Sequence, residues 1–420
     1  MGMTLAEKIL ARAAGRSAVC AGELVTCTVD KIMATDITAP LTIEVFRRMG
    51  ATRVADPEAC ILINDHFVPA KDIRSADFAR AMREFAKEQG IRRYFEVGRS
   101  GICHVLVPEK GLVSPGELFV GADSHTCTAG ALGAFATGVG STDLAAAWAL
   151  KELWFRVPPT LRVELRGSFR PHVTSKDAVL RLIGELGVEG ARYQAIEFHG
   201  EALVTMPMHA RLTLCNMAVE AGAKAGMIPC DDITAAYVTA HGGSVDRAVT
   251  PDADASYTAV LAIDVSALEP QVAEPFMPSN IRPVGDFRGL RVDQVFIGSC
   301  TNGYLEDLRA AAAILRGRKV ADGVRLIVTP ATQSIYLEAV REGIVADLVE
   351  AGAAVTTPTC GACLGGHMGV LGKDEVALAT TNRNFRGRMG DLSARVYLAN
   401  PEVAAATAVT GTITHPEELP

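Results

Sequence analysis

Short apolar runs alternate with longer amphipathic or polar stretches along most of this chain of 420 residues. Four of these runs cover residues 59–65, 291–300, 323–331 and 375–382, and each is predicted to form a short strand. Strands that alternate with helical stretches are typical of α/β layers with mostly parallel sheets. The pattern therefore predicts an α/β fold that binds its ligands where Gly-, Ser-, Thr- and Asn-rich loops follow the carboxyl ends of strands.

Two interruptions of this pattern predict domain boundaries. Residues 141–155 have a helix-like pattern that stops just before Pro158 and Pro159, and a Pro-rich stretch covers residues 269–283. Domains of roughly 150 residues would give two or three in a chain of this length. We expect three α/β domains, at residues 1–159, 160–277 and 278–420.

Composition and charge exclude several classes of protein. Hydrophobic residues make up 49% and charged residues 21%, which excludes disorder as the main state. With 41 Lys and Arg against 48 Asp and Glu, the net charge is −7, which argues against general nucleic-acid binding. We expect no signal peptide and no membrane helix, because the stretches without charged residues are rich in Gly and Thr. Ten cysteines without an export signal indicate the reducing cytoplasm.

Three of the cysteines stand in a context that suggests a site. Cys300 lies in GSCTNG, and Cys360 and Cys363 lie in TPTCGACLGGH, each beside Gly after an apolar run. A Cys-x-x-Cys pair alone fits a redox pair, half a zinc site or an iron–sulfur site. The third cysteine, with no fourth equally well placed, suggests a metal centre that keeps one coordination position open. The alternative is that Cys300 is a small buried hydrophobic residue.

Three histidines follow apolar stretches in the first 130 residues, and we expect each of them on a loop. They are His66 in NDHF, His104 in GICH and His125 in GADSHTCTAG. Asp65 and Asp123 accompany the first and third, and an aspartate orients an imidazole and makes it a stronger proton carrier. One such pair is usually a surface or capping pair, but the three motifs together favour acid–base chemistry.

Two further motifs carry polar side chains suited to a small ligand. Asn216 and Glu220 are four residues apart, which places both on one face of a predicted helix, although a solvated pair is the alternative.

A second motif is a Gly-containing loop that is rich in Arg and Asn. Guanidinium groups bind carboxylates in a bidentate manner, so this loop is a candidate seat for a di- or tricarboxylate, with a solvated basic turn as the alternative. Its polar residues are Asn382, Arg383, Asn384, Arg386 and Arg388.

Four of these motifs, DSHT, SCTN, CGAC and NRNFRGR, occur in an order and spacing that resemble the aconitase superfamily. The resemblance extends from about Lys31 to the end of the chain and is strongest to the branch of isopropylmalate dehydratases and homoaconitases. It implies three α/β domains with mostly parallel sheets around a shared cluster site. It also implies one [4Fe–4S] cluster, held by Cys300, Cys360 and Cys363, whose fourth iron is open to substrate.

The resemblance also implies roles for the polar residues. His66, backed by Asp65, matches the acid that protonates the departing hydroxyl. His104 and Asp123 match a second histidine–carboxylate pair. His125 and Glu220 match a pair that contacts the water or hydroxyl at the open iron. Residues that match groups around the substrate and cluster are Asn216, Asn382, Arg383 and Arg388.

The activity that the resemblance implies is that of a hydro-lyase in leucine biosynthesis, which converts 2-isopropylmalate to 3-isopropylmalate through isopropylmaleate. Homoaconitate and dimethylmalate are alternative substrates. Pro40 stands where aconitases have Gln. No further pair of cationic residues lies beside one of the motifs, where it could bind a third carboxylate of the substrate. A substrate with an apolar substituent is therefore favoured. Departures at Tyr304 and Ala362, where the branch usually has Arg and Pro, leave the cluster motif intact.

The resemblance further implies a partner. Single-chain aconitases continue into a swivelling domain that supplies a Ser base, whereas this chain stops at Pro420, so we expect that domain on a separate small subunit. Two classes of protein remain as rivals, a non-catalytic iron–sulfur sensor of the aconitase type and a plain Cys-x-x-Cys oxidoreductase. The intact histidine motifs and the acidic charge favour the enzyme.

Overall fold

The structure is a computed structural model that describes residues 2–419, and its contacts divide the chain into two compact units. Unit 1 extends to Arg99 and also includes Leu106–Leu165 and Glu189–Ala262. Unit 2 contains Ser100–Val105, Arg166–Val188 and the chain from Ile263 onward. Each unit is therefore built from segments that are not consecutive in sequence. The division into three domains at residues 159 and 277 stays a prediction.

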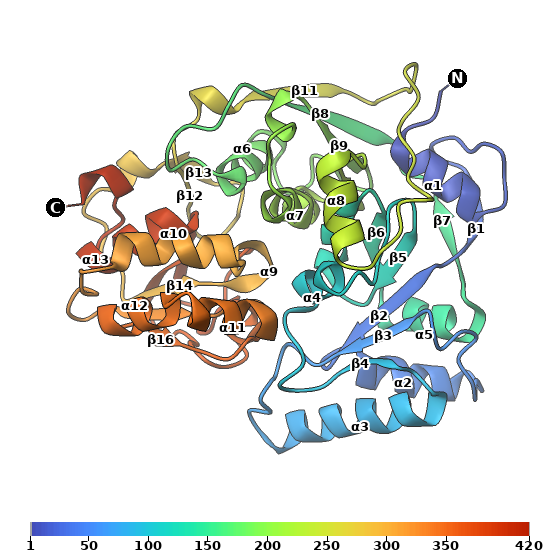
Figure 1. Ribbon diagram of the computed structural model, residues 1–420, viewed down its shortest axis with the longest axis horizontal. Coiled ribbons are helices and arrows are strands. Elements are labelled where there is room, and N and C mark those ends of the chain that lie inside the picture. The colour runs from blue at the N-terminus through green and yellow to red at the C-terminus, as the bar shows by residue number, and fades with distance from the viewer. Residues whose placement is uncertain (1, 420) are drawn as a thin grey trace. The chain divides into compact units, whose positions relative to one another are not determined.

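A parallel sheet of five strands, in the order β4-β3-β2-β5-β6, forms the centre of unit 1 (Figure 1). Its inner strands β3 and β5 are short apolar runs that are buried along their whole length, as is usual for parallel sheets covered on both faces. Phe46, Phe85 and Trp148, from three different helices, pack together, with 5.0 Å between the ring centroids of Phe85 and Trp148. The strands are β2 (Lys31–Thr35), β3 (Cys60–Ile63), β4 (Arg93–Phe95), β5 (Leu118–Gly121) and β6 (Phe135–Gly138).

Two smaller sheets complete unit 1. β1 (Leu24–Thr28) pairs with β7 (Glu152–Arg156) in an antiparallel ribbon. Most residues of a second sheet, in the order β10-β9-β8-β11, also belong to unit 1. Its strands are β8 (Thr160–Arg166), β9 (Ala195–His199), β10 (Ala225–Met227) and β11 (Val260–Asp264). The helices of this unit are α1 (Leu5–Ala13), α2 (Ala39–Arg48), α3 (Ile73–Gln89), η1 (Ser124–Leu132), α5 (Ser141–Leu150), η2 (Glu201–Leu203), α7 (Met208–Met217), η3 (Ala218–Ala221) and α8 (Asp232–Ala240).

The helix expected over residues 141–155 is too long. α5 ends at Leu150, and Lys151 adopts a left-handed conformation with a φ of 58°. The next five residues form β7, whose side chains alternate between exposed and buried positions. Pairing with β1 therefore overrides the helical pattern after residue 150, because it buries Leu153 and Phe155.

Unit 2 is built on a sheet of seven strands in the order β13-β12-β18-β17-β14-β15-β16. The five strands from β18 to β16 are parallel, and β12 and β13 add an antiparallel edge. The strands are β12 (Gln271–Ala273), β13 (Ile281–Pro283), β14 (Gln294–Ile297), β15 (Arg325–Val328), β16 (Ala354–Val355), β17 (Val376–Ala379) and β18 (Arg395–Leu398). Its helices are α6 (Ser175–Leu186), η4 (Val265–Ala267), η5 (Val284–Phe287), α9 (Ser299–Asn302), α10 (Leu305–Leu315), α11 (Gln333–Arg341), α12 (Ile344–Ala351), η6 (Gly361–Leu364), α13 (Pro401–Thr410) and η7 (Pro416–Glu418).

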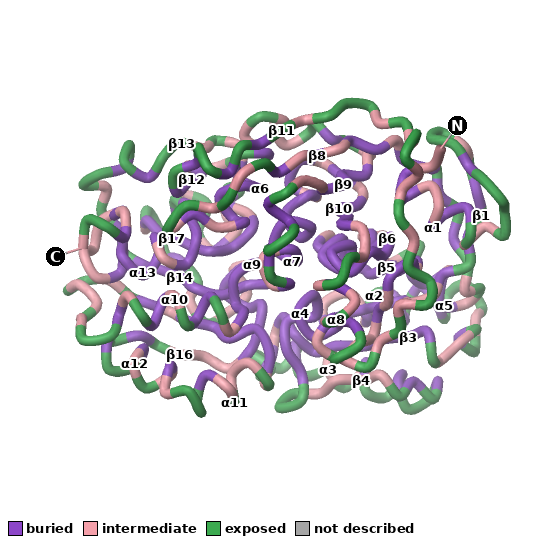
Figure 2. The backbone as a smooth tube through the Cα atoms, turned by 45° about the horizontal axis from the view of Figure 1, so that its top comes forward, coloured by how far each residue is buried: buried purple, intermediate pink, exposed green. Residues whose placement is uncertain are grey.

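The α/β class with mostly parallel sheets is confirmed, and the four predicted strands are β3, β14, β15 and β17. Central strands such as β5 and β14 are buried along their whole length (Figure 2). No helix between residues 2 and 419 is both long and apolar enough to cross a membrane.

Candidate functional site

The candidate acid–base residues of unit 1 follow the carboxyl ends of neighbouring strands. Asp36 follows β2, and Asp65 follows β3 after one intervening residue. Asp123 comes two residues after β5, on the other side of β2. The three strands are parallel, so their carboxyl ends meet at one edge of the sheet. The fold therefore gathers three carboxylates that lie far apart in the sequence.

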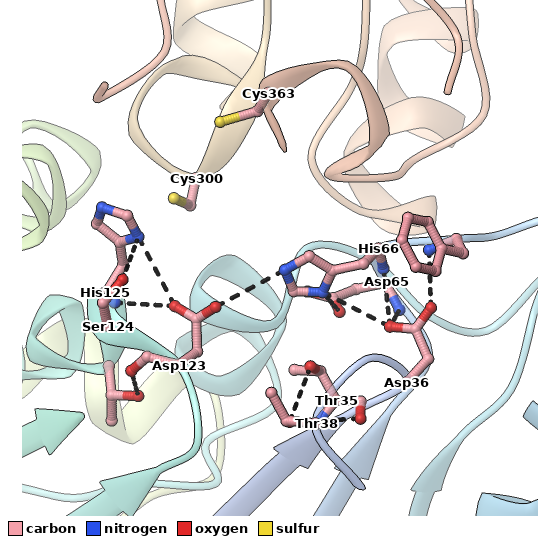
Figure 3. A network of polar contacts seen from close by, with 12 residues as sticks. Thr35, Asp36, Thr38, Asp65, His66, Asp123, Ser124, His125, Cys300 and Cys363 are labelled. Atoms are coloured by element: carbon pink, nitrogen blue, oxygen red, sulfur yellow. Dashed lines mark hydrogen bonds and ion pairs between the residues drawn. The ribbon is translucent and has the colours of Figure 1, made fainter. Parts of the chain in front are cut away.

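His66 is held by two of these carboxylates (Figure 3). Its Nδ1 lies 2.5 Å from Oδ1 of Asp65 and 3.5 Å from Oδ1 of Asp36. Asp36 also accepts hydrogen bonds from the backbone N–H groups of Asp65, His66 and Phe67, at 3.3, 2.9 and 2.7 Å. The carboxylate of Asp36 thus fixes the turn that carries His66 as well as contacting its ring.

These contacts give His66 the character of an acid. Burial by itself would lower its pKa, but the charge of Asp65 and the hydrogen bonds that Asp36 and Asp65 accept raise the pKa well above the ordinary value of 6.5. Burial would likewise raise the pKa of Asp36, but its contacts with His66 and the backbone N–H of Phe67 lower it. The raised pKa favours the protonated form of this imidazole at neutral pH, which is the form that can donate a proton.

Asp123 connects His66 to a second buried pair. Its Oδ2 lies 3.7 Å from Nε2 of His66, and its Oδ1 accepts a hydrogen bond of 2.8 Å from the backbone N–H of His125. Nε2 of His125 lies 2.7 Å from Oε1 of Glu220, and both side chains are buried. The loop expected for His125 is wrong, because this residue belongs to the 3-10 helix η1, which Asp123 caps.

The shared helix face expected for Asn216 and Glu220 is also wrong. α7 ends at Met217, and Glu220 lies in the separate 3-10 helix η3. The two residues nevertheless belong to one network. Nδ2 of Asn216 donates to Oγ1 of Thr128 at 2.8 Å, and that hydroxyl donates to the backbone carbonyl of His125 at 2.6 Å. Asn216 therefore supports the backbone of His125, whereas Glu220 holds its ring.

His104 belongs to unit 2 and is buried. It lies in the first turn of α4 (Cys103–Glu109), so the loop expected for it is wrong. In the GICH motif the apolar residues continue into the helix α4, whereas the apolar run before His66 is the strand β3, which ends at Ile63.

The cysteine motifs lie on unit 2 at the ends of strands β14 and β16. Cys300 is in the short helix α9 after β14, Cys360 directly precedes η6, and Cys363 lies within η6. All three are buried. Gly298 permits the tight turn before Cys300, since its φ is 154° and a Cβ there would lie 2.8 Å from the carbonyl oxygen of Thr329.

Asn382 joins two of the cysteines. It follows β17, the parallel neighbour of β14. Its Nδ2 donates to Sγ of Cys300 at 3.2 Å, and Sγ of Cys363 donates to its Oδ1 at 3.7 Å. Nη2 of Arg388 contacts Sγ of Cys363 at 3.8 Å. The structure therefore brings Cys300, Cys363, Asn382 and Arg388 together within unit 2.

The other residues of the Arg-rich loop differ in exposure and contacts. Arg383 is partly exposed. Arg386 is exposed and lies over the ring of Phe276, at 4.1 Å from the centroid. Asn384 is buried and donates to the backbone carbonyl of Glu274 at 2.7 Å, which indicates a structural role.

Asp36 is the functional residue that the sequence reading missed. The signal was present, because Asp36 directly follows the apolar run of β2 in the way that the recognised polar residues follow their strands. Its role depends on backbone N–H groups some 30 residues away, which no local pattern reveals.

Comparison with known proteins is consistent with this geometry. The sequence profile described as the aconitase family (aconitate hydratase) matches residues 7–289 and 285–411. The 3-isopropylmalate dehydratase large subunit of Moorella thermoacetica is 57% identical over 419 residues, which cover 100% of both chains. The 3-isopropylmalate dehydratase large subunit 1 of Methanopyrus kandleri is 53% identical over 99% of both chains.

A solved structure supports the fold alone. The holo-form of aconitase X from Thermococcus kodakaraensis matches with a TM-score of 0.50 and 13% sequence identity, over 89% of each chain. The relatives above are 57% and 53% identical over nearly the whole of both chains, and similarity at that level shows the family as well as the fold. The chain therefore belongs to the aconitase family, and within it to the family of 3-isopropylmalate dehydratase large subunits.

Proposed function

We propose that this chain is the large subunit of an enzyme that isomerises 2-isopropylmalate to 3-isopropylmalate through isopropylmaleate, in leucine biosynthesis. The observation that carries the proposal is the continuous series of contacts Asp65–His66–Asp123–His125–Glu220. Loss of water from a hydroxy acid needs a proton donor for the departing hydroxyl, and a protonated histidine between carboxylates is suited to that role. The full-length similarity to dehydratase large subunits gives independent support.

The cysteine site suits a [4Fe–4S] cluster. Its three candidate ligands are buried cysteines, and two of them contact the amide of Asn382. Thiolates are the usual ligands of iron–sulfur clusters, and N–H donors such as those of Asn382 and Arg388 tune them. Held by Cys300, Cys360 and Cys363, the cluster would supply a Lewis acid for the substrate hydroxyl.

The side chains of unit 1 would move the protons. His66 would donate its Nε2 proton to the departing hydroxyl, because Asp65 holds Nδ1 at 2.5 Å whereas Nε2 lies farther, at 3.7 Å, from Asp123. His66 would regain its proton from the water that adds to isopropylmaleate in the second half of the isomerisation, as the hydroxyl of that water joins the substrate, and the carboxylates around the ring favour this protonated form. His125, oriented by Glu220, would hydrogen-bond the water that forms. We assign His104 to the same reaction as a further acid–base residue.

The substrate carboxylates would be bound by guanidinium and amide groups. Arg383 and Arg388 supply forks that match a carboxylate, and Arg388 lies next to Cys363. Asn216 and Asn382 would position the groups around the substrate through the contacts already described.

A small subunit completes the proposed enzyme. It would provide the base that removes the proton from the substrate carbon and the pocket for the isopropyl group. The heterodimer, or a higher assembly of it, would work in the cytoplasm, whose reducing conditions keep cysteines such as the ten of residues 2–419 reduced.

The proposal is tested by anaerobic reconstitution of the chain with iron and sulfide, followed by addition of a small subunit and 2-isopropylmalate. We expect a brown protein that contains iron and that turns over 2-isopropylmalate only when the small subunit is present. A protein that takes up stoichiometric zinc in place of iron, or that shows no turnover with the small subunit, would overturn it.

A further inference from the structure

Lys176 connects the two loops that bear Cys300 and Asn382. It lies in the first turn of α6 and is fully buried, with 0% of its surface exposed. Its Nζ donates to the backbone carbonyls of Thr380 and Thr381 at 2.8 and 2.7 Å. Longer contacts of 3.3 and 3.4 Å reach Oδ1 of Asn302 and Oγ1 of Thr301. One ammonium group therefore touches the segments that follow β14 and β17.

The start of α6 holds this ammonium group in place. Thr174 and Asp177 form a capping box at the helix N-terminus. The carboxylate of Asp177 also accepts hydrogen bonds from the backbone N–H of Gln271 at 2.7 Å and from Nδ2 of Asn400 at 2.9 Å. The turn that carries Lys176 is thus tied to β12 and to the cap of α13, and the lysine has little freedom to move away.

A buried lysine bonded to uncharged oxygen atoms is costly, so its presence calls for a reason. Burial lowers the pKa of Lys176 to about 8, while attraction to Cys300 and Cys363 opposes this decrease. Four contacts to neutral oxygens can hold an ammonium group, but a neutral N–H donor could bond such oxygens without burying a charge if holding the loops were its only task. The nearby cysteines are the groups that benefit from a positive charge.

We propose that Lys176 is a positioning residue of the cysteine site, which clamps the Cys300 and Asn382 loops together and supplies a buried positive charge to the three thiolates and their cluster. This inference rests on the cluster of the proposed function. Charges interact strongly where little water screens them, so one ammonium group near the sulfurs offsets part of their negative charge. Reduction of a cluster adds an electron, and a nearby positive charge makes that reduction easier.

Three variants separate the effect of the positive charge from the effect of the hydrogen bonds that hold the two loops together. Lys176→Met removes both the charge and the donors, Lys176→Gln keeps an N–H donor without the charge, and Lys176→Arg keeps the charge. Lys319→Met is the control, because Lys319 is an exposed lysine of unit 2 that bonds a backbone carbonyl, so the net charge changes equally. Iron affinity and the midpoint potential of the cluster are measured in the anaerobically reconstituted chain.

We expect the midpoint potential of Lys176→Gln and Lys176→Met to become more negative, and that of Lys176→Arg and Lys319→Met to stay near the wild-type value. Iron affinity should decrease by roughly 10- to 100-fold in Lys176→Met. If Lys176→Met does not fold, Lys176→Gln carries the test of the charge. A cluster of unchanged potential in Lys176→Gln overturns this inference alone, whereas a wild-type chain that binds no cluster overturns the proposed function with it.

Discussion

Nδ1 of His66 lies 2.5 Å from Oδ1 of Asp65, and both side chains are buried. A histidine ring in such surroundings would ordinarily lose its proton, because burial disfavours the charged form. Here the carboxylates of Asp65 and Asp36 reverse that effect and raise the pKa of His66 well above 6.5. The same pair therefore sets both the orientation of the ring and the pH range in which it can act as an acid.

The first prediction concerns the pH dependence of turnover. Since the pKa of His66 is raised, the acid form persists through neutral pH, and activity should decrease only as the pH increases past that raised pKa. Asp65→Asn removes a charge that favours the imidazolium, so this decrease in kcat should begin at lower pH. The measurement is the pH profile of kcat with 2-isopropylmalate and the small subunit.

The matched control is Asp77→Asn, which neutralises an exposed carboxylate in α3 of the same unit. Its pH profile should be that of the wild type. An unshifted profile in Asp65→Asn would show that His66 is not the acid.

The second prediction concerns Asp36. Asp36→Ala removes the acceptor for three backbone N–H groups and a charge that contacts a buried imidazolium. We expect the free energy of unfolding to decrease by about 3–5 kcal/mol, the usual cost of removing one partner of a buried ion pair. Asp36→Asn keeps one carbonyl acceptor and should cost less. Denaturant unfolding of both variants measures the difference, and equal stabilities for Asp36→Ala and the wild type would contradict the assigned role.

The strand-end chemistry could largely be predicted from sequence, because polar residues directly after apolar runs mark the ligand-binding edge of a parallel sheet. Cys300 after β14 and His66 after β3 were found in this way. Local patterns failed where the chain changes its backbone conformation within a motif. Asn216 and Glu220 have helical spacing, yet α7 stops between them, because Met217 leaves the helical conformation and Gly222 ends η3 in a left-handed one.

Lys176 shows a second limit of the sequence. In TSKD it follows a helix cap, and a lysine at the start of a helix is normally solvated. It is buried because loops more than 100 residues further along the chain close over it. Asp36 is similar, since its partners come from the segment that follows another strand, β3. Such roles depend on which strands become neighbours, and spacing within one motif does not contain that information.

The third prediction separates the three site cysteines from the other seven. Cys300→Ala, Cys360→Ala and Cys363→Ala should each lose iron, visible absorbance and activity together, because each removes a proposed cluster ligand. Cys20→Ala is the control, since Cys20 is exposed and belongs to unit 1. Iron and sulfide analysis of the reconstituted variants measures how much cluster each one holds. A full cluster in Cys363→Ala would remove this residue from the ligand set.

The fourth prediction compares three arginines of one loop. Arg383→Lys and Arg388→Lys keep the charge but lose the planar fork, so kcat/KM for 2-isopropylmalate should decrease by the equivalent of about 2–4 kcal/mol. Arg386→Lys is the matched control, because Arg386 is exposed and lies over Phe276. Its kinetics should resemble those of the wild type. Unchanged kcat/KM in Arg383→Lys would place that residue outside the substrate site.

The most direct test of the central claim is a comparison of substrates by the complete enzyme. The reconstituted chain, paired with the small subunit encoded nearest to it, is given 2-isopropylmalate, homoaconitate, dimethylmalate or citrate, and kcat/KM is measured for each. The account predicts that 2-isopropylmalate is preferred and that neither subunit is active alone. A preference for homoaconitate by more than about tenfold, or roughly 1.4 kcal/mol, or full activity of this chain by itself, would contradict it.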